Sequence, residues 1–277
     1  MKVTREGIRD FENMLYLSEK SQATVEKYSA ALHRLRAYLA GEELDKKRLL
    51  EYREALLQKN KARTVNVALS AINAYLEFTG QGDYRIRLLK IQRRAFTEED
   101  RELGEEEYRR LLCAARARGN KRLHLVMLTL SGTGIRISEL PFITVEAVRS
   151  GRAEIRLKGK TRMVLLPKEL RRRLAEFCRA SGIKSGYIFR TRSGRPVDRS
   201  NICHEMKRLC AQAGVEEGKV FPHNLRHLFA RSYFAVEKNL PHLADVLGHS
   251  SIETTRIYVA VSAAAHERTL NRMRLII

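Results

Sequence analysis

The sequence predicts a mainly helical protein with two domains and one small β-hairpin. Apolar residues recur at helical spacing in residues 1–90 and again from residue 104 onwards. Between these regions the periodicity fades and charged residues accumulate, as is typical of a linker. Two short apolar segments flank a turn that contains Gly159, which predicts the hairpin. We therefore expect domains at 1–90 and 104–277, joined by a linker at 91–103.

The chain carries a large excess of positive charge. It has 53 Lys and Arg against 32 Asp and Glu, which gives a formal net charge of +21 and a pI near 10.2. The basic residues are spread along the whole chain, which favours nucleic acid over a membrane surface as the partner. A solvated basic surface without a partner is the alternative. The N-terminus lacks the apolar region of a signal peptide, and no apolar run reaches the ~20 residues of a membrane span, so we expect a cytoplasmic protein.

The first domain is expected to be all-helical. Three segments, 25–39, 49–56 and 65–76, have apolar residues three and four positions apart, so each predicts an amphipathic helix. Basic residues flank these helices and continue into the linker. They are expected to contact a DNA backbone, although a plain bundle with solvated side chains has the same pattern. The basic residues are Lys46, Lys47, Arg48, Lys61, Arg63, Arg93 and Arg94.

The second domain is expected to combine helices with the hairpin. The predicted elements are helices at 105–117 and 123–130 and strands at 154–157 and 163–166. Gly132 and Gly134 are expected to end the second helix. After Pro167 the helical pattern resumes and is expected to continue nearly to the C-terminus. The four cysteines, Cys113, Cys178, Cys203 and Cys210, form no CxxC pair, so we expect reduced core residues and no zinc.

The segment from Pro222 to His227 carries the first candidate chemistry. Pro222 suits the first turn of a helix, and His223 and Arg226 share one face of it. A histidine can move protons there, and an arginine can bind phosphate oxygens. His223 and His227 have the spacing of helical zinc ligands, but Asn224 stands where that motif requires glutamate, so no metal is expected. A satisfied core histidine beside a surface arginine is the structural alternative.

Tyr258 is the second candidate. Gly248 suits the C-terminal cap of one helix, and Ser250 and Glu253 have the spacing of a capping box that begins another. His249 would lie in the joint between them, with Tyr258 two turns further on. A phenol can attack phosphorus and hold a strand covalently, whereas a lone helical tyrosine more often only packs.

An arginine and an acid follow the glycine-rich turn. Gly134 permits a sharp turn that presents Arg136 at the start of the following helix, where Glu139 can hold it. A buried structural ion pair between the two is equally consistent with this spacing.

Basic residues also line the predicted hairpin. Lys158, Lys160 and Arg162 alternate along it and are expected to share a face. Such a face is usually only solvated, but it can also enter a DNA groove and bring an ammonium group to a leaving oxygen.

Taken together, these motifs resemble the tyrosine recombinase, or phage integrase, family, including its Xer-type members. Each motif is loose alone, but the set in this order is highly specific, with nine residues from His249 to Tyr258. The catalytic half matches closely, and the N-terminal half resembles the family's core-binding domain only as a pattern. The motifs are Thr133 to Leu140, the Lys-bearing hairpin, Pro222 to His227, Leu247 to Ser250, and Ile257 with Tyr258.

The resemblance implies a two-domain DNA clamp. Its parts would be a helical, SAM-like core-binding domain at 1–90 and a mixed α+β catalytic domain at 104–277. The C-terminal helix would be exchanged between protomers; Leu270, Met273 and Ile277 are spaced as one face of it. The implied partners are double-stranded DNA and further copies of the chain, as a homotetramer in the synaptic complex and a monomer in solution, with no membrane.

The resemblance also implies a role for each candidate residue. The product would be a 3′-phosphotyrosyl link with a free 5′-hydroxyl, formed without metal, ATP or another cofactor. Two rival functions are DNA relaxation like that of a type IB topoisomerase, and DNA binding by a catalytically inactive relative. The implied residues are the phosphate-binding Arg136 and Arg226, the acid Lys160 with Lys158 as the alternative, the base His223, the hydrogen-bond donor His249, the nucleophile Tyr258, and the supporting Glu139 and His227.

Overall fold

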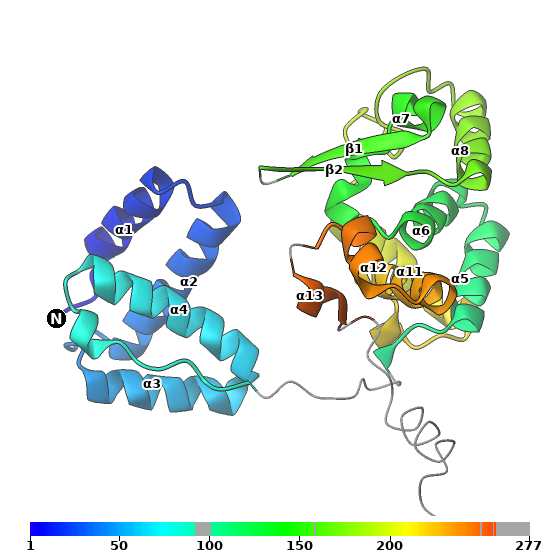
Figure 1. Cartoon of the computed structure of the whole chain (residues 1–277). Coiled ribbons are helices and arrows are strands. Elements are labelled where there is room, and N and C mark those ends of the chain that lie inside the picture. The colour runs from blue at the N-terminus through cyan, green and yellow to red at the C-terminus, as the bar shows by residue number, and fades with distance from the viewer. Residues whose placement is uncertain (92–100, 158, 250, 257, 259–277) are drawn as a thin grey trace, which may run out of the picture. The chain divides into compact units, whose positions relative to one another are not determined.

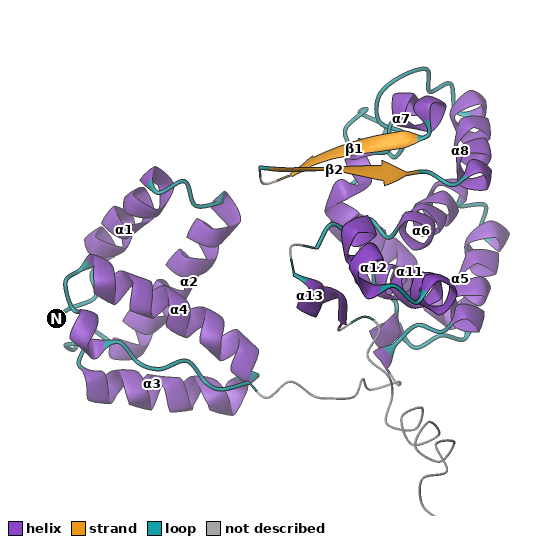
Figure 2. Ribbon diagram, viewed as in Figure 1, coloured by secondary structure: helices purple, strands orange, loops and turns teal. Residues whose placement is uncertain are grey.

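The computed structural model describes residues 1–91, 101–157, 159–249, 251–256 and 258. The chain divides into two compact units, residues 1–93 and 94–277. In the described part, both units are built mainly from helices, and the strands shown in Figure 2 are those of one hairpin in the second unit. None of the described helices is both long and apolar enough to cross a bilayer.

The first unit is a bundle of four helices. Its helices are α1 Arg5–Leu17, α2 Gln22–Leu39, α3 Lys46–Lys59 and α4 Ala62–Phe78, followed by the short 3₁₀ helix η1 Gly82–Tyr84 (Figure 1). The predicted apolar stripes face one core, in which Phe11, Leu35 and Ile72 are fully buried. The helix expected at residues 25–39 is α2. Its C-terminal cap is Ala40, which adopts the left-handed conformation, and Gly41 follows it.

The second unit is organised around a buried helix, α6. The elements before the hairpin are α5 Glu105–Ala117, α6 Lys121–Thr133, the 3₁₀ helix η3 Ile137–Phe142 and α7 Val145–Ser150. Helix α5, helix α8 (Lys168–Ala180) and helix α11 (Pro222–Glu237) pack against α6, which explains why most positions from Leu123 to Leu130 are apolar. Gly132 lies inside α6, and it is Gly134, with φ +64°, that ends the helix. Pro141 lies in η3, where a 3₁₀ turn replaces the expected α-helix.

The hairpin has longer strands and a tighter turn than the sequence predicts. Strands β1 Arg152–Leu157 and β2 Lys160–Leu165 pair antiparallel, with Leu157 opposite Lys160. Only two positions separate the paired ends of the strands, and Gly159, in the second of them, has φ +71°. Lys160 lies within β2 rather than in the turn. Alternate residues of β1, such as Ala153 and Ile155, are buried against the unit.

The remaining elements follow the hairpin. They are α8 Lys168–Ala180, α9 Arg199–Lys207, α10 Cys210–Ala213, the 3₁₀ helix η4 Glu217–Lys219, α11 Pro222–Glu237, α12 Leu240–Leu247 and α13 Ile252–Arg256. The expectation of continuous helix after Pro167 is wrong for residues 181–198, which contain turns and isolated bridges. All four cysteines are free thiols, as expected. Cys178 and Cys210 are buried, whereas Cys203 is half-buried and Cys113 is exposed rather than part of the core.

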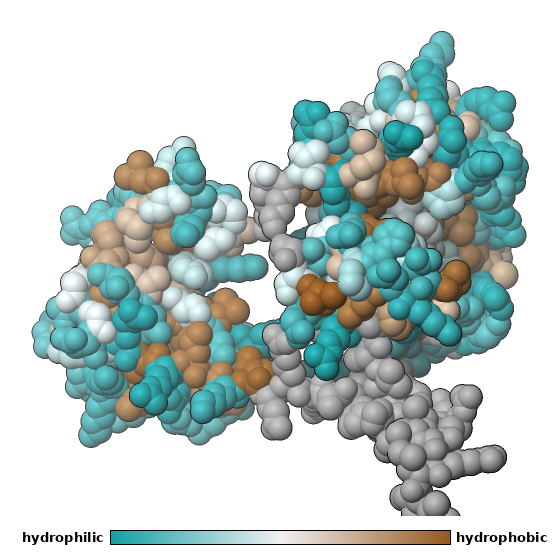
Figure 3. Space-filling model, in the orientation of Figure 1, coloured by the Kyte–Doolittle hydropathy of each residue, from teal (hydrophilic) through white to brown (hydrophobic). Residues whose placement is uncertain are grey.

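Hydrophilic side chains dominate the surface that Figure 3 shows, with smaller hydrophobic patches on both units. This distribution agrees with a chain in which 31% of residues are charged. It also means that apolar burial is confined largely to the separate cores of the two units.

Candidate active site

Arg226 is a fully buried arginine on α11. Pro222 begins this helix, as predicted, and places Arg226 one turn in, with none of its side chain exposed. Its guanidinium donates hydrogen bonds to the carbonyl oxygens of Gly134 at 2.5 Å and Leu247 at 2.8 Å. Within the described residues it makes no ion pair with a carboxylate. A buried cation without a carboxylate is costly, so this position is suited to an anionic ligand.

His249 lies beside Arg226, in the joint between α12 and α13. Gly248 caps α12 in the left-handed conformation, as predicted, and turns the chain so that His249 faces the guanidinium. Arg226 donates to Nε2 of His249 at 2.7 Å, and Nδ1 of His249 lies 2.8 Å from Oγ1 of the buried Thr255. Because arginine can only donate, Nε2 must be the unprotonated nitrogen, and Nδ1 donates to Thr255. Thr255 is a site residue that the sequence motifs did not suggest.

Tyr258 is packed among three histidines. Its ring stacks on His249 at a centroid distance of 5.3 Å and meets the edge of His227 at 4.4 Å. Its hydroxyl lies 3.3 Å from Nε2 of His223, within hydrogen-bonding distance. The tyrosine is only 6% exposed. The structure thus brings a phenol, a proton acceptor and a buried arginine into one cluster.

The three histidines of this cluster are held in their neutral forms. Burial is the largest cause of the lowered pKa of each histidine, and the positive charge of Arg226 lowers it further. The pKa of His223 is lowered from its ordinary value, and those of His227 and His249 are lowered to about 4. Burial also lowers the pKa of Arg226, to about 10, so the guanidinium remains charged at neutral pH. The cluster therefore combines a permanent cation with neutral imidazoles.

Arg136 and Glu139 form a second group next to this cluster. Glu139 is 3% exposed, and its carboxylate accepts from the backbone N–H of Arg136 at 2.7 Å and from its guanidinium at 3.1 Å. Burial alone would raise the pKa of the Glu139 carboxyl, but these contacts and Arg162 outweigh it and hold the pKa below its usual value. The Arg136 side chain remains 41% exposed, so it keeps a face available to a ligand.

Arg162 occupies a different position from the one expected. Its side chain is 15% exposed and pairs with Glu139 at 2.6 Å, which turns the guanidinium inward. This position does not fit the expected DNA contact. In the hairpin Arg162 lies opposite the buried Ile155, so its side chain is on the face that covers the unit rather than on an outward face.

A cavity of about 580 Å³ opens beside these groups. Its lining includes Arg136, His249 and residues of both hairpin strands. A phosphate group bound there would meet Arg136 and His249 together, at the edge of the cluster that holds Tyr258.

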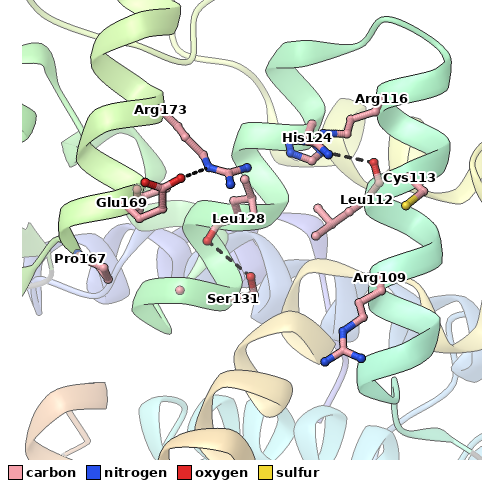
Figure 4. Close-up of a pocket in the computed structure, with 12 residues that line it drawn as sticks. Arg109, Leu112, Cys113, Arg116, His124, Leu128, Ser131, Pro167, Glu169 and Arg173 are labelled. Carbon is pink, nitrogen blue, oxygen red and sulfur yellow. Dashed lines mark hydrogen bonds and ion pairs between the residues drawn. The ribbon is translucent and has the colours of Figure 1, made fainter.

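A second cavity, of about 520 Å³, lies between α5, α6 and α8. Figure 4 shows Arg116 beside His124 there, and Arg173 paired with Glu169. His124 Nδ1 donates to the carbonyl oxygen of Leu112 at 3.2 Å, in keeping with a neutral imidazole whose pKa burial lowers. This cavity contains none of the residues expected to act in catalysis, and it is separate from the Tyr258 cluster.

The structure describes the expected lysines of the hairpin and the expected DNA-contacting residues only in part. Lys160 belongs to β2, but its side chain lies outside the described part, as do Lys158, Arg93, Arg94 and the expected C-terminal exchange helix. Lys46 and Arg48 lie in the first turn of α3; Lys46 donates to the carbonyl oxygen of Asp83, and Arg48 pairs with Glu42. The exposed members of the basic set in the first unit are Lys46, Lys47, Lys61 and Arg63.

Two family models match the chain. The model described as the phage integrase family matches residues 101–265, and that of the phage integrase N-terminal SAM-like domain matches residues 8–81. The first match alone covers more than half of the chain. The chain belongs to the phage integrase family. The motifs around Arg136, Arg226 and Tyr258 therefore identified the family correctly from sequence.

Curated relatives support the same assignment over the whole length. Tyrosine recombinase XerA of Thermococcus kodakarensis is 31% identical over 288 residues, covering 100% of this chain and 98% of the relative. XerA of Pyrococcus furiosus is 27% identical, covering 98% and 95%. The chain is an Xer-like tyrosine recombinase, a DNA strand transferase of site-specific recombination.

Solved structures share the fold. A crystal structure of XerA recombinase has a TM-score of 0.55 at 22% identity, covering 98% of this chain and 99% of that one. A lambda integrase dimer bound to a COC′ core site has a TM-score of 0.74 at 19% identity, covering 92% and 76%. These likenesses confirm the predicted fold class of two mainly helical domains with a small hairpin in the second.

Proposed function

We propose that the chain cleaves one strand of duplex DNA by attack of Tyr258 on a phosphodiester and rejoins it to a new partner strand. The observation that carries this proposal is the fully buried Arg226, which has no carboxylate partner in the described residues and lies within the Tyr258 cluster. A phosphate is the anion that would compensate such a charge in a protein with net charge +21.

Arg136 and Arg226 would bind the non-bridging oxygens of the scissile phosphate. Their planar donors match two oxygens and strengthen as negative charge builds in the transition state. Glu139 supports Arg136 from behind, through two hydrogen bonds. His249 would turn from Arg226 to the phosphate, which requires the proton to move to Nε2 or the ring to reorient, since Nε2 accepts a hydrogen bond from Arg226.

His223 would accept the Tyr258 proton. An ordinary phenol has a pKa near 10, so attack at neutral pH needs a nearby base. The Nε2 atom of His223 lies 3.3 Å from the hydroxyl. Burial and the neighbouring arginines lower the pKa of His223, which keeps the imidazole neutral and able to take a proton. His227 packs against the same ring and would support its orientation.

Lys160 would protonate the leaving 5′-oxygen. Lys160 is the first residue of β2, the strand that also carries Arg162 and contributes to the lining of the cavity described above. Lys158 remains the alternative acid. The product would be a 3′-phosphotyrosyl link and a free 5′-hydroxyl. Because the covalent bond conserves the energy of the phosphodiester, no ATP is required. The two arginines would stabilise the charge on the phosphate and Lys160 would protonate the leaving oxygen, so we expect no need for a metal.

DNA would be held by both units and by further copies of the chain. The exposed basic residues of the first unit, among them Lys47, Lys61 and Arg63, are proposed to contact the backbone. One solved relative is a lambda integrase tetramer bound to a Holliday junction, which supports the proposal of a homotetramer formed from monomers on DNA. An enzyme acting on the chromosome would work in the cytoplasm, the location expected from the sequence.

A comparison of two assays in the presence of EDTA tests this function. The substrate is a plasmid carrying two copies of a site, located by mapping covalent protein–DNA adducts on fragments of the source genome. We expect exchange between the two sites, seen as excision of the intervening segment. Relaxation of supercoils without exchange would instead support the topoisomerase-like rival. Binding without any covalent adduct would support the inactive relative.

A further inference from the structure

Arg162 joins the hairpin to the turn that presents His249. Its Nη1 donates to the carbonyl oxygen of Val246 at 2.8 Å, while Nη2 donates to Glu139. Its stem lies directly on Gly248: a Cβ atom at position 248 would come within 2.3 Å of Cδ of Arg162. Only glycine therefore fits position 248, both for this contact and for its φ of +65°.

Glu139 extends this connection to Arg136. One oxygen of its carboxylate accepts from the Arg136 guanidinium, and the other accepts from both the Arg136 backbone and Arg162. A carboxylate that is 3% exposed needs these donors, because burial penalises its charge. Removal of Arg162 would leave one oxygen with a single donor, and the carboxylate would shift together with Arg136.

We propose that Arg162 is a positioning residue that holds Arg136, through Glu139, and His249, through Val246 and Gly248, in one fixed arrangement around the scissile phosphate. This inference rests on the proposed function. In this proposal Arg162 itself does not bind DNA, since its guanidinium is turned inward and its Nη1 and Nη2 atoms both donate to the protein. Its contribution is to fix the spacing between two phosphate-binding groups that come from distant parts of the chain.

Substitution of Arg162 separates positioning from DNA binding. In Arg162→Met the stem over Gly248 is retained and both hydrogen bonds are lost. We expect adduct formation on a nicked suicide substrate at saturating DNA to slow by about 10–100-fold, as for other residues that orient a ligand-binding group. The dissociation constant for DNA should stay within about twofold of that of the unmodified protein, because no phosphate contact is lost.

Arg156→Met is the matched control. Arg156 lies on the same hairpin, loses the same charge in the same substitution, and is 73% exposed with Glu154 as its ion-pair partner. We expect its adduct rate to remain near that of the unmodified protein. A weakened DNA affinity in Arg162→Met together with an adduct rate at saturating DNA near that of the unmodified protein would overturn the proposal and make Arg162 a DNA contact. An unchanged affinity with an unchanged adduct rate would overturn it as well.

A methylphosphonate at the scissile position distinguishes positioning from general damage to the fold. Replacing one charged oxygen by methyl removes part of what Arg136 and His249 must bind. The rate ratio between unmodified protein and Arg162→Met should then shrink to about threefold or less for at least one diastereomer. An equal ratio on all substrates would refute the proposed route through the phosphate-binding groups.

Arg162→Lys provides a second variant should the methionine variant fold poorly. Lysine keeps a charge for Glu139, but its single ammonium group cannot also reach Val246 in the forked geometry of arginine. We expect a smaller rate loss with the same dependence on the phosphonate; a rate equal to that of the unmodified protein would contradict the need for the fork. Failure of the unmodified protein to form any adduct would refute the proposed function itself, before either variant is measured.

Discussion

The Arg226 guanidinium donates to Nε2 of His249 at 2.7 Å, and this contact fixes which histidine nitrogen carries the proton. The proton must lie on Nδ1, where it is donated to Thr255 on α13. One chain of hydrogen bonds therefore links the buried arginine of α11 to the short helix that precedes Tyr258. The position of the phosphate site and that of the nucleophile are coupled through this chain.

Thr255→Val should weaken catalysis through His249. Valine has nearly the shape of threonine but cannot accept from Nδ1, so the imidazole loses the partner that sets its orientation. Loss of one such hydrogen bond corresponds to about a tenfold decrease in the adduct rate at saturating DNA. Thr64→Val is the control, because Thr64 is exposed on α4 of the first unit and does not line the cavity beside His249. Equal rates for the two variants would show that Thr255 does not position His249.

The buried histidines should make stability depend on pH in the acid range. The pKa of His227 is lowered to about 4 by burial first and then by His223 and Arg226, against about 6.5 in the unfolded chain. The unfolded state therefore binds more protons between these values, and stability is lost as pH falls through this window. We expect the Tm to decrease from pH 7 to pH 4, less steeply in His227→Phe. Identical slopes would mean that His227 is not buried in its neutral form.

Gly134→Ala should destabilise the protein more than an alanine at a comparable turn. Gly134 has φ +64°, and a Cβ atom there would lie 2.3 Å from the Phe229 ring. Gly182 has the same φ of +64° with no neighbour within 4 Å. Alanine at Gly182 should lower the free energy of unfolding by about 1–2 kcal/mol for the left-handed conformation. At Gly134 overpacking should add about 1–3 kcal/mol. Denaturant unfolding measures both, and equal losses would contradict the close contact with Phe229.

Local signals in the sequence predicted much of this fold. Pro222 at the start of α11 and Gly248 at the end of α12 occupy the positions that their backbone preferences favour. Such preferences depend on neighbouring residues alone. For the same reason, the amphipathic stripes of the first unit were readable, because each repeats within a single helix.

Contacts between distant segments could not be read in this way. Strand alternation predicts which residues share a face with Arg162, but not that Glu139 and Val246 cover that face. The helical spacing of Arg226 suggested a residue presented at a surface, whereas the packing of α11 on α6 and α12 buries it completely. The sequence did not predict a role for Thr255, because its contact with His249 depends on the path of the chain between α12 and α13.

Mass spectrometry of the covalent protein–DNA adduct is the most direct test of the role of Tyr258. The unmodified protein is trapped on a suicide substrate in EDTA, digested, and the peptide bearing the nucleotide is sequenced. We predict a single modified residue, Tyr258, joined to a 3′-phosphate, with no adduct from Tyr258→Phe although that variant still binds DNA. A nucleotide attached to any other residue, or an adduct that persists in Tyr258→Phe, would contradict the assignment of Tyr258 as the nucleophile.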